Sequence, residues 1–469
     1  MGRDPADSPP APSLLPRGAV HSSHARALAL LVALCAAPLA LAAAPAVPEP
    51  PVLPARLTLA DALRTFRERG LDLLIADAAV ASAEGDLRVA GAVANPSLSA
   101  SYGRSHTRGD CVDAQGNPTS CGWLPDPLYG LGLSDSAALF DTLTGKRGLR
   151  VSAARAALQA AKASRADAER TIGVQVKQQV VQVVLAQESL RFAREVATSQ
   201  ARALELTRTR EAAGAISEAD VARVEVTKLE ADQAVDTAAQ ALRDARAQLA
   251  FLLGVRGETP EFEVDAPELE RSHEPPALAG ATVASLLARA TDRRPDLRAA
   301  RAQRERAEAS LALAHRQRFP DVTLSVNYTQ QGTTNQAITP PTFTFGLSLP
   351  LPIFYQQQGE IARAEADVAN QSLQASKLEA QVASDVATGL SDYAGSGALV
   401  RRMEGGLLAR AERARDLVQV QYRKGAASLL DYLDAQRTFV ATRVEYRQDL
   451  SAYWNAVFKL EAAVGEELR

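Results

Sequence analysis

The sequence repeats itself once, and this repeat constrains the fold more than any other feature does. Residues 57–255 resemble residues 281–469, and Asp72 and Asp296, which are equivalent, lie 224 positions apart. Further equivalent pairs are Pro96 and Pro320, Gly132 and Gly346, Phe140 and Phe354, Gly145 and Gly359, Gly214 and Gly425, Asp220 and Asp431, and Gly254 and Gly465. The separation shrinks to 214 and then to 211, as expected for a duplicated unit with small deletions. The chain is therefore one architecture built twice.

The segments outside the two copies have distinct compositions. Residues 1–44 have a polar start and an apolar middle, and they close on small residues, which predicts a secretory signal peptide. Alternatives are a membrane anchor, since ~18 apolar residues can span a bilayer, and a lipidation site at Cys35. A Pro-rich linker (45–56) precedes the first copy, and an acidic, Pro-containing linker (256–280) joins the two.

Composition and missing motifs exclude several function classes. A net charge of -3 gives no basic surface for nucleic acid, and 46% hydrophobic residues argue against disorder. Five His, three Cys and two Met offer little material for a soft-metal site. The sequence contains no Walker loop, GxSxG, HExxH or CxxC motif, so we expect no cofactor, no resident metal site, no catalytic residues and no enzyme.

Each copy reads as helix, strand, loop, strand, long helix, turn and helix. The first helix is expected at about 58–94, broken near Gly70. Apolar and small polar residues then alternate with period two, which predicts strands at about 96–103, 128–139, 320–330 and 342–354. A tilted strand of this length can cross a bilayer, and apolar-out, small-polar-in alternation is typical of a membrane barrel wall. The alternative is two hairpins on a soluble core. Asp135 stands where the second copy has Leu349, so this end of the strand is not expected to face lipid.

Two very long helices follow the strands. Residues 145–210 and 358–423 contain no Pro, and at ~1.5 Å per residue each forms a rod of roughly 100 Å. Such rods need neighbours along their length, as in a coiled coil. Each ends at a glycine turn followed by Ser-x-x-Asp, a capping-box pattern that starts the next helix. The sequence therefore predicts an antiparallel helical hairpin in each copy.

Two cysteines lie in the polar loop expected between the first two strands. Cys111 and Cys121 flank a segment rich in Gly, Asn and Pro. In an exported protein such a pair is most simply a disulfide, and two free thiols are the alternative.

Four strands cannot close a barrel, and open sheet edges are not viable in lipid. Several copies of the chain must therefore combine. Two copies would give eight strands, whose interior is filled by side chains, and three would give twelve, with room for a lumen. The helical hairpins would continue such a barrel as a tube.

The twofold repeat, the two-strand insertions and the long helices resemble the TolC family of outer-membrane efflux proteins. The likeness covers 57–469, and the motifs QGEIARAEADV (358–368) and YRKGAASLLDYLDAQRT (422–438) are most similar to the cation-efflux (CzcC-type) branch. The resemblance implies a mostly α protomer with a small membrane β part, and a homotrimer forming a twelve-stranded outer-membrane barrel continued by a periplasmic α-helical barrel. It implies as partners a periplasmic adaptor protein, an inner-membrane RND pump and outer-membrane lipid, and it implies no catalysis.

The same resemblance points to the tip of the second hairpin as the functional site. It implies that Asp431 and Asp434 narrow the periplasmic aperture. Independently, residues three apart share one helix face, and threefold symmetry would turn them into two carboxylate rings that attract cations. The alternative is that Asp431 only caps a helix and Asp434 is solvated. The first copy has Asp220 but carries Arg223 in place of the second aspartate, which suggests that only the second hairpin lines the aperture.

The hairpin tips are also the expected docking surface for the adaptor. The candidate residues are Arg210, Gly214, Ser217, Asp220, Tyr422, Arg423, Lys424, Gly425 and Ser428. For any one of them the alternative is a solvated turn. The predicted function is the outer-membrane channel of a tripartite efflux system that passively conducts heavy-metal cations. Alternatives are a channel for drugs, small molecules or secreted proteins, and a periplasmic coiled-coil adaptor that forms no channel.

Overall fold

The computed structural model describes residues 48–331 and 340–468, and the side chains of 105–112 and 120–126 are not among what it describes. Almost all of these residues belong to one compact unit, Pro50–Arg469, and the account below is of that unit. The expected signal peptide (1–44) and Cys35 lie outside the described residues.

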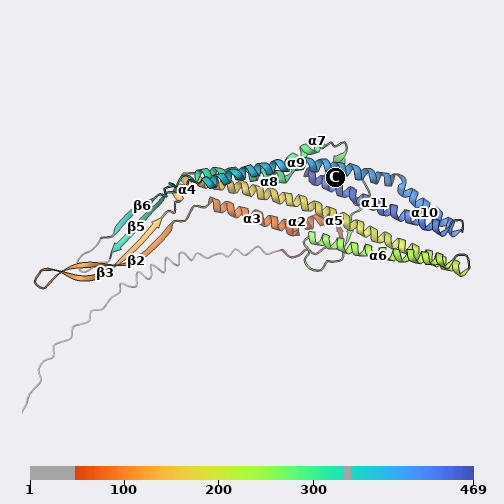
Figure 1. Ribbon diagram of the computed structural model, residues 1–469, viewed down its shortest axis with the longest axis horizontal. Helices are drawn as coiled ribbons and strands as arrows, with labels where there is room; N and C mark the ends of the chain where they lie inside the picture. Colours follow the sequence, from red (N-terminus) through yellow and green to blue (C-terminus); the bar gives the residue numbers. More distant parts are fainter. Residues whose placement is uncertain (1–47, 332–339, 469) are drawn as a thin grey trace, which may run out of the picture. The chain divides into compact units, whose positions relative to one another are not determined.

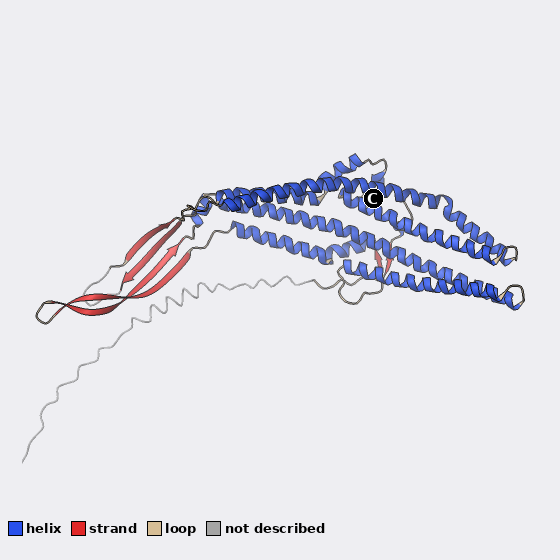
Figure 2. Cartoon of the chain, viewed as in Figure 1, coloured by secondary structure: helices blue, strands red, loops and turns tan. Residues whose placement is uncertain are grey.

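Both copies of the repeat run through two helices, two strands and a helical hairpin, and the first copy also has the short helix α4 before its hairpin (Figures 1 and 2). The first copy contains α2 (Leu59–Arg69), α3 (Leu71–Gly91), β2 (Ser97–Val112), β3 (Pro118–Ser134), α4 (Ala138–Leu143), α5 (Lys146–Ala212) and α6 (Glu218–Leu252). The second contains α7 (Val283–Arg293), α8 (Pro295–Arg316), β5 (Thr323–Gln331), β6 (Thr342–Ser348), α9 (Gln358–Arg402), η3 (Met403–Leu407), α10 (Leu408–Arg423) and α11 (Leu429–Val464). The expected break near Gly70 is confirmed, since α2 ends and α3 begins there.

The four longer strands form one antiparallel sheet in the order β2-β3-β5-β6. Residues paired across neighbouring strands in the rows that follow are alike in polarity. One face carries two apolar rows: Leu98, Leu133, Val326 and Phe345; and Ala100, Leu131, Tyr328 and Phe343. The other face carries two rows of small and polar residues: Ser99, Gly132, Asn327 and Thr344; and Ser101, Gly130, Thr329 and Thr342. The sheet thus has one face suited to lipid and one suited to water.

The strands of the first copy extend further than their alternation predicted. Residues 104–112 and 118–127, expected to lie in a polar loop, pair with each other in β2 and β3. Backbone pairing to a hairpin partner does not require alternating side chains, and a tight turn closes the ladder. In that turn Asp113 accepts hydrogen bonds from the backbone N–H groups of Gln115 (2.9 Å) and Asn117 (2.8 Å). The predicted Cys111–Cys121 disulfide falls on side chains outside those the structure describes.

Two strands end earlier than expected, β3 at Ser134 and β6 at Ser348. Asp135 explains the first of these ends. Its carboxylate accepts hydrogen bonds from the backbone N–H of Leu324 (2.8 Å) and of Ala137 (3.1 Å), so it joins the base of β3 to β5 and closes the turn. Asp135 therefore ends the sheet and does not belong to its apolar face.

The long helices of the two copies differ in one respect. The first, α5, is a single helix of 67 residues. The second covers 358–423, as expected, but is broken by the π-helical segment η3, where Gly406 has a φ of 146°. The prediction of an uninterrupted second rod was therefore wrong. A glycine tolerates this backbone conformation, and π-helical insertions commonly bend helices.

The acidic linker is part of the core and not only a connector. Its β4 (Glu263–Asp265) pairs in parallel with β1 (Arg56–Thr58), which lies just before α2. Phe262, Val264 and Leu269 are buried against α2, α5, α6 and α11. The linker contains two short 3₁₀ turns, η1 (Pro267–Leu269) and η2 (Pro276–Leu278). Within 48–331 and 340–468, no helix combines the length and the apolarity needed to cross a membrane.

Candidate functional site

The turns of the two helical hairpins lie at the same end of the helical bundle, at the end away from the sheet (Figure 1). Both turns are built alike. Gly214 and Gly425 end their helices in the left-handed conformation, with φ of 72° and 78°. Ser217 then caps α6 and Ser428 caps α11. The predicted glycine turns and capping boxes are thus confirmed in both copies.

In each capping box a serine and an aspartate bind each other. At the second tip, the Ser428 hydroxyl donates to Asp431 (2.7 Å), and the Asp431 backbone N–H donates to the Ser428 oxygen (3.2 Å). Ser217 and Asp220 do the same at 2.8 and 3.3 Å. The hydrogen bonds from the hydroxyl and the backbone N–H of Ser428 lower the pKa of Asp431. Asp431 is therefore a carboxylate at neutral pH and a helix cap at once.

The two tips carry different charges one turn further along. In the first copy, the Arg223 guanidinium lies 3.4 Å from the Asp220 carboxylate. In the second, Asp431 is followed by Asp434, and both side chains are exposed. No basic side chain of the described residues pairs with either of them. The second tip therefore presents two uncompensated carboxylates on one helix face, and the first presents a neutralised pair.

The two hairpins are joined just behind their tips. Arg210 of α5 donates hydrogen bonds to the carbonyl oxygens of Tyr422 (2.9 Å) and Arg423 (3.0 Å) at the end of α10. Its guanidinium also lies 4.7 Å from the centre of the Tyr422 ring, a cation–π contact. That ring stacks on Tyr432 of α11 at 5.2 Å. An apolar cluster that includes Leu204, Val221 and Val224 surrounds the stacked pair.

These contacts divide the residues expected at the docking surface into two groups. Arg210 is held by the other hairpin, and Tyr422 is only 4% exposed, so neither side chain is free at the surface. Six of the expected residues remain outside this contact, namely Gly214, Ser217, Asp220, Lys424, Gly425 and Ser428. Arg423 takes part in it through its carbonyl oxygen only, and its side chain is exposed. Tyr432, whose ring stacks on that of Tyr422, was not among the residues predicted for the site. In a chain with only 5% aromatic residues, two tyrosines flanking one turn were a usable signal.

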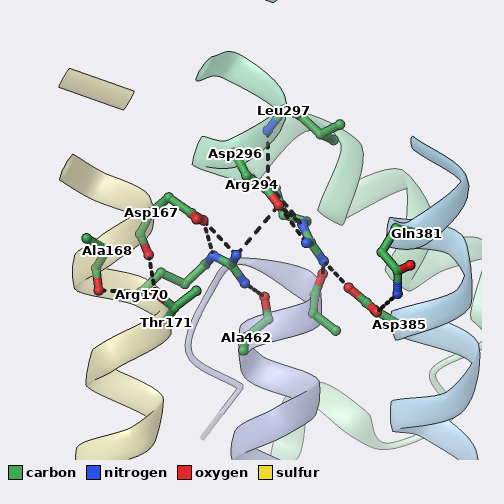
Figure 3. Close-up of polar contacts among 11 residues, drawn as sticks. Asp167, Ala168, Arg170, Thr171, Arg294, Asp296, Leu297, Gln381, Asp385 and Ala462 are labelled. Atoms are coloured by element: carbon green, nitrogen blue, oxygen red, sulfur yellow. Dashed lines mark hydrogen bonds and ion pairs between the residues drawn. The ribbon is translucent and has the colours of Figure 1, made fainter. Parts of the chain in front are cut away.

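A second polar cluster fixes the far end of α11 to helices of both copies (Figure 3). The Arg294 guanidinium binds the carboxylates of Asp296 (2.6 Å) and Asp385 (3.2 Å) and the carbonyl oxygen of Ala463 (3.1 Å). Arg170 of α5 binds Asp167 (2.6 Å) and donates to the carbonyl oxygen of Ala462. Four helices, α5, α8, α9 and α11, meet in this cluster.

Asp296 of this cluster stays ionised although it is partly buried. Burial alone would raise the pKa of Asp296, but the hydrogen bond and charge of Arg294 and the charge of Arg170 outweigh it and lower the pKa. Nearby, the buried Lys177 ammonium pairs with Glu461 at 2.7 Å. No pattern in the sequence predicted this cluster, because its members are far apart in the chain.

The described part of the chain offers no group of three or more His, Cys, Asp or Glu side chains that could hold a metal ion. The described residues form a two-faced sheet at one end of a helical bundle and charged turns at the other, an arrangement typical of a conduit.

Comparison with known proteins agrees with this architecture. The family described as "Outer membrane efflux protein" matches residues 62–255 and 286–466, one span in each copy of the repeat. The chain belongs to this family. It is accordingly an outer-membrane efflux channel protein, with its sheet in the outer membrane and its helical part in the periplasm. The predicted family, fold class and location are confirmed.

Three relatives illustrate the range of the family. The chain is 27% identical over 325 residues to the cobalt-zinc-cadmium resistance protein CzcC of Cupriavidus metallidurans, covering 69% of this chain and 74% of CzcC. It is 30% identical over 415 residues to the pyoverdine export outer membrane protein OpmQ of Pseudomonas aeruginosa, covering 84% of this chain and 81% of OpmQ. The crystal structure of CusC has the same fold, with a TM-score of 0.70 and 19% identity, covering 87% of this chain and 92% of CusC.

Proposed function

We propose that this protein is the outer-membrane component of a tripartite RND efflux system and that it conducts heavy-metal cations passively to the cell exterior. Three copies form the channel, a periplasmic adaptor docks at the hairpin tips, and an inner-membrane RND pump supplies the cargo. The observation that carries the cation proposal is the exposed, uncompensated pair Asp431 and Asp434 at the second tip. The similarity to a cobalt-zinc-cadmium resistance protein supports the same cargo.

The proposed homotrimer follows from the sheet. Among the described strands, β2 and β6 each pair on one side only, and a membrane sheet cannot leave such edges open to lipid. Three four-stranded sheets give twelve strands, enough for a lumen. Phe345 and Leu347 are 80% and 68% exposed, as expected for side chains that contact lipid.

In the trimer, the carboxylates of the second tip form two rings around the periplasmic aperture. Carboxylate rings concentrate cations and repel anions. Because the first tip is neutralised by Arg223, only the second hairpin contributes to the rings. The side chains of Arg423 and Lys424 are exposed and are left to contact the adaptor, although the Arg423 carbonyl oxygen belongs to the joint between the hairpins.

Export of small organic molecules is the second candidate. It is favoured by the 30% identity to a pyoverdine export protein, over a longer alignment than that with CzcC. Both candidates use the same channel and differ in the pump that feeds it. They therefore differ in which compounds become toxic when the gene is removed.

The test is a deletion strain complemented with the wild-type gene or with a gene carrying Asp431→Asn and Asp434→Asn. Growth is measured on cobalt, zinc and cadmium salts and on hydrophobic drugs. We expect the deletion to lower metal tolerance, the wild-type gene to restore it and the variant to restore it only in part. Asn at 431 still accepts the capping hydrogen bonds, so the helix start is kept.

The matched control is Asp220→Asn, the equivalent change at the first tip, which should restore full tolerance. Unchanged metal tolerance in the deletion strain would contradict the metal assignment, and new sensitivity to organic compounds alone would favour the second candidate.

A further inference from the structure

A cavity lies where α5, the linker and α11 meet, away from the hairpin tips. Its volume is about 310 Å³. Its charged lining consists of Arg191, Arg271, Arg443, Arg447, Glu188 and Glu270. The four guanidinium groups outnumber the two carboxylates, so the cavity is positively charged.

One of the two carboxylates is already engaged by two of the arginines. Glu188 binds Arg191 at 2.5 Å and Arg447 at 3.3 Å. Arg447 also donates to the carbonyl oxygen of Glu188 at 2.5 Å. The other carboxylate, Glu270, is exposed on the linker and reaches no arginine of the described residues at ion-pair distance.

Arg443 has no acidic partner among the described residues. Its Nε is buried without a hydrogen-bond acceptor. Its guanidinium lies beside two aromatic rings, 5.9 Å from the centre of Phe192 and 6.0 Å from that of Phe439. Contact with an aromatic face does not neutralise a guanidinium, so the charge of Arg443 is not compensated by these rings.

The neighbouring positive charges disfavour the charged form of Arg447. Burial lowers the pKa of Arg447, and the charges of Arg443 and Arg191 act in the same direction, against those of Glu188 and Glu195. A cavity that gathers positive charge in partly buried surroundings is stabilised by a counter-ion that supplies acceptors to the guanidinium groups.

We propose that this cavity binds a small oxyanion with two or more negative charges, of the phosphate or dicarboxylate type. Guanidinium groups bind phosphate and carboxylate oxygens through paired N–H donors, which gives such sites geometric preference over chloride. The site is distinct from the cation path at the hairpin tips, and its occupancy does not depend on which cargo the channel conducts.

The test is isothermal titration of the purified full-length protein in detergent with inorganic phosphate, succinate or chloride at constant ionic strength. We expect phosphate or succinate to bind, and Arg443→Gln to weaken that binding at least about tenfold, a typical loss for one charge-assisted contact. The control is Arg437→Gln, which removes an exposed arginine of the same helix outside the cavity and should leave the affinity unchanged. Preference for phosphate or for succinate identifies the type of oxyanion.

A second variant tests charge separately from packing. Glu270→Gln removes an exposed carboxylate from the rim and should tighten anion binding by roughly two- to fivefold, an effect that damage to the fold would not produce. Arg271→Gln should weaken it by a similar factor, which gives a second readout if Arg443→Gln does not fold. The proposal is overturned if the wild type binds neither oxyanion more tightly than chloride, or if the variants of cavity residues bind like Arg437→Gln.

Discussion

The first hairpin, α5 with α6, and the second, α9 to α11, have the same turn and the same cap but differ in charge and in the continuity of their helices. Both have the same glycine turn and the same serine cap. They differ at three places: the charge one turn after the cap, the break at η3, and the cluster around Arg294. The shared features are local and set the fold, whereas the differences make the second hairpin charged at its tip and interrupted along its length.

The second copy depends on Arg294 in a way that has no counterpart in the first, where Gly70 stands at the equivalent position. We expect Arg294→Met to lower the free energy of unfolding by about 3 kcal/mol, because it removes the guanidinium that binds two carboxylates and the carbonyl group of Ala463. Thermal unfolding followed by circular dichroism in detergent measures the loss. Arg293→Met is the control, since Arg293 is exposed and its ion pairs are 3.8 Å and 4.0 Å long. Equal effects of the two changes would show that the cluster does not anchor the second copy.

We expect the break at η3 to depend on Gly406 and not on its neighbour Gly405. At the φ of Gly406, 146°, a side chain is strained, so Gly406→Ala should destabilise the protein by about 1–3 kcal/mol. Gly405 has no positive φ and nothing lies within 4 Å of an added Cβ. Gly405→Ala should therefore be close to neutral in the same melting experiment. Similar losses for both variants would mean that the break is not set by the conformation of Gly406.

A tyrosine connects the broken helix to α11. The Tyr446 hydroxyl donates to Glu404 in η3 at 2.9 Å, and Ser272 of the linker donates to the same carboxylate at 2.8 Å. Burial, together with the hydrogen bond to Glu404 and its charge, raises the pKa of Tyr446 to about 12. Because the folded pKa lies above the ordinary value near 10, this contribution is complete below pH 10 and is lost as the pH rises toward 12.

Tyr446→Phe should therefore cost about 1 kcal/mol at pH 8, the value of one hydrogen bond, and the difference from the wild type should shrink between pH 10 and pH 12. Melting midpoints across this range measure it. A difference that stays constant with pH would contradict a hydrogen bond made only by the protonated hydroxyl.

Local patterns predicted most of this fold. The helices, turns and caps were predictable because a glycine turn and Ser-x-x-Asp act within a few residues, and period-two alternation gave the two faces of the sheet. The pairing of 104–112 with 118–127 was missed because backbone pairing there has no side-chain pattern. The break at η3 was missed although Gly405 and Gly406 were visible, since a glycine pair permits a π segment without requiring one.

The site was harder to predict because it depends on contacts between distant segments. The cap at Asp431 was predictable, but the hydrogen bonds of Arg210 to the other hairpin join residues more than 200 positions apart. The arginine cluster at the end of α11 is of the same kind. The roles of Asp431 and Asp434 in the aperture and of the tips in docking stay predictions.

The most direct test of the difference between the two hairpins is single-channel recording in planar bilayers with a trivalent cation as blocker. If the second tip alone lines the aperture, Asp434→Asn should weaken the block by at least about tenfold and lower the cation conductance, because a ring of carboxylates that concentrates cations is removed. Asp220→Asn, which changes the first tip's counterpart of Asp431, should change neither the block nor the conductance. Equal responses of the two variants, or none in either, would contradict the assignment of the aperture to the second hairpin.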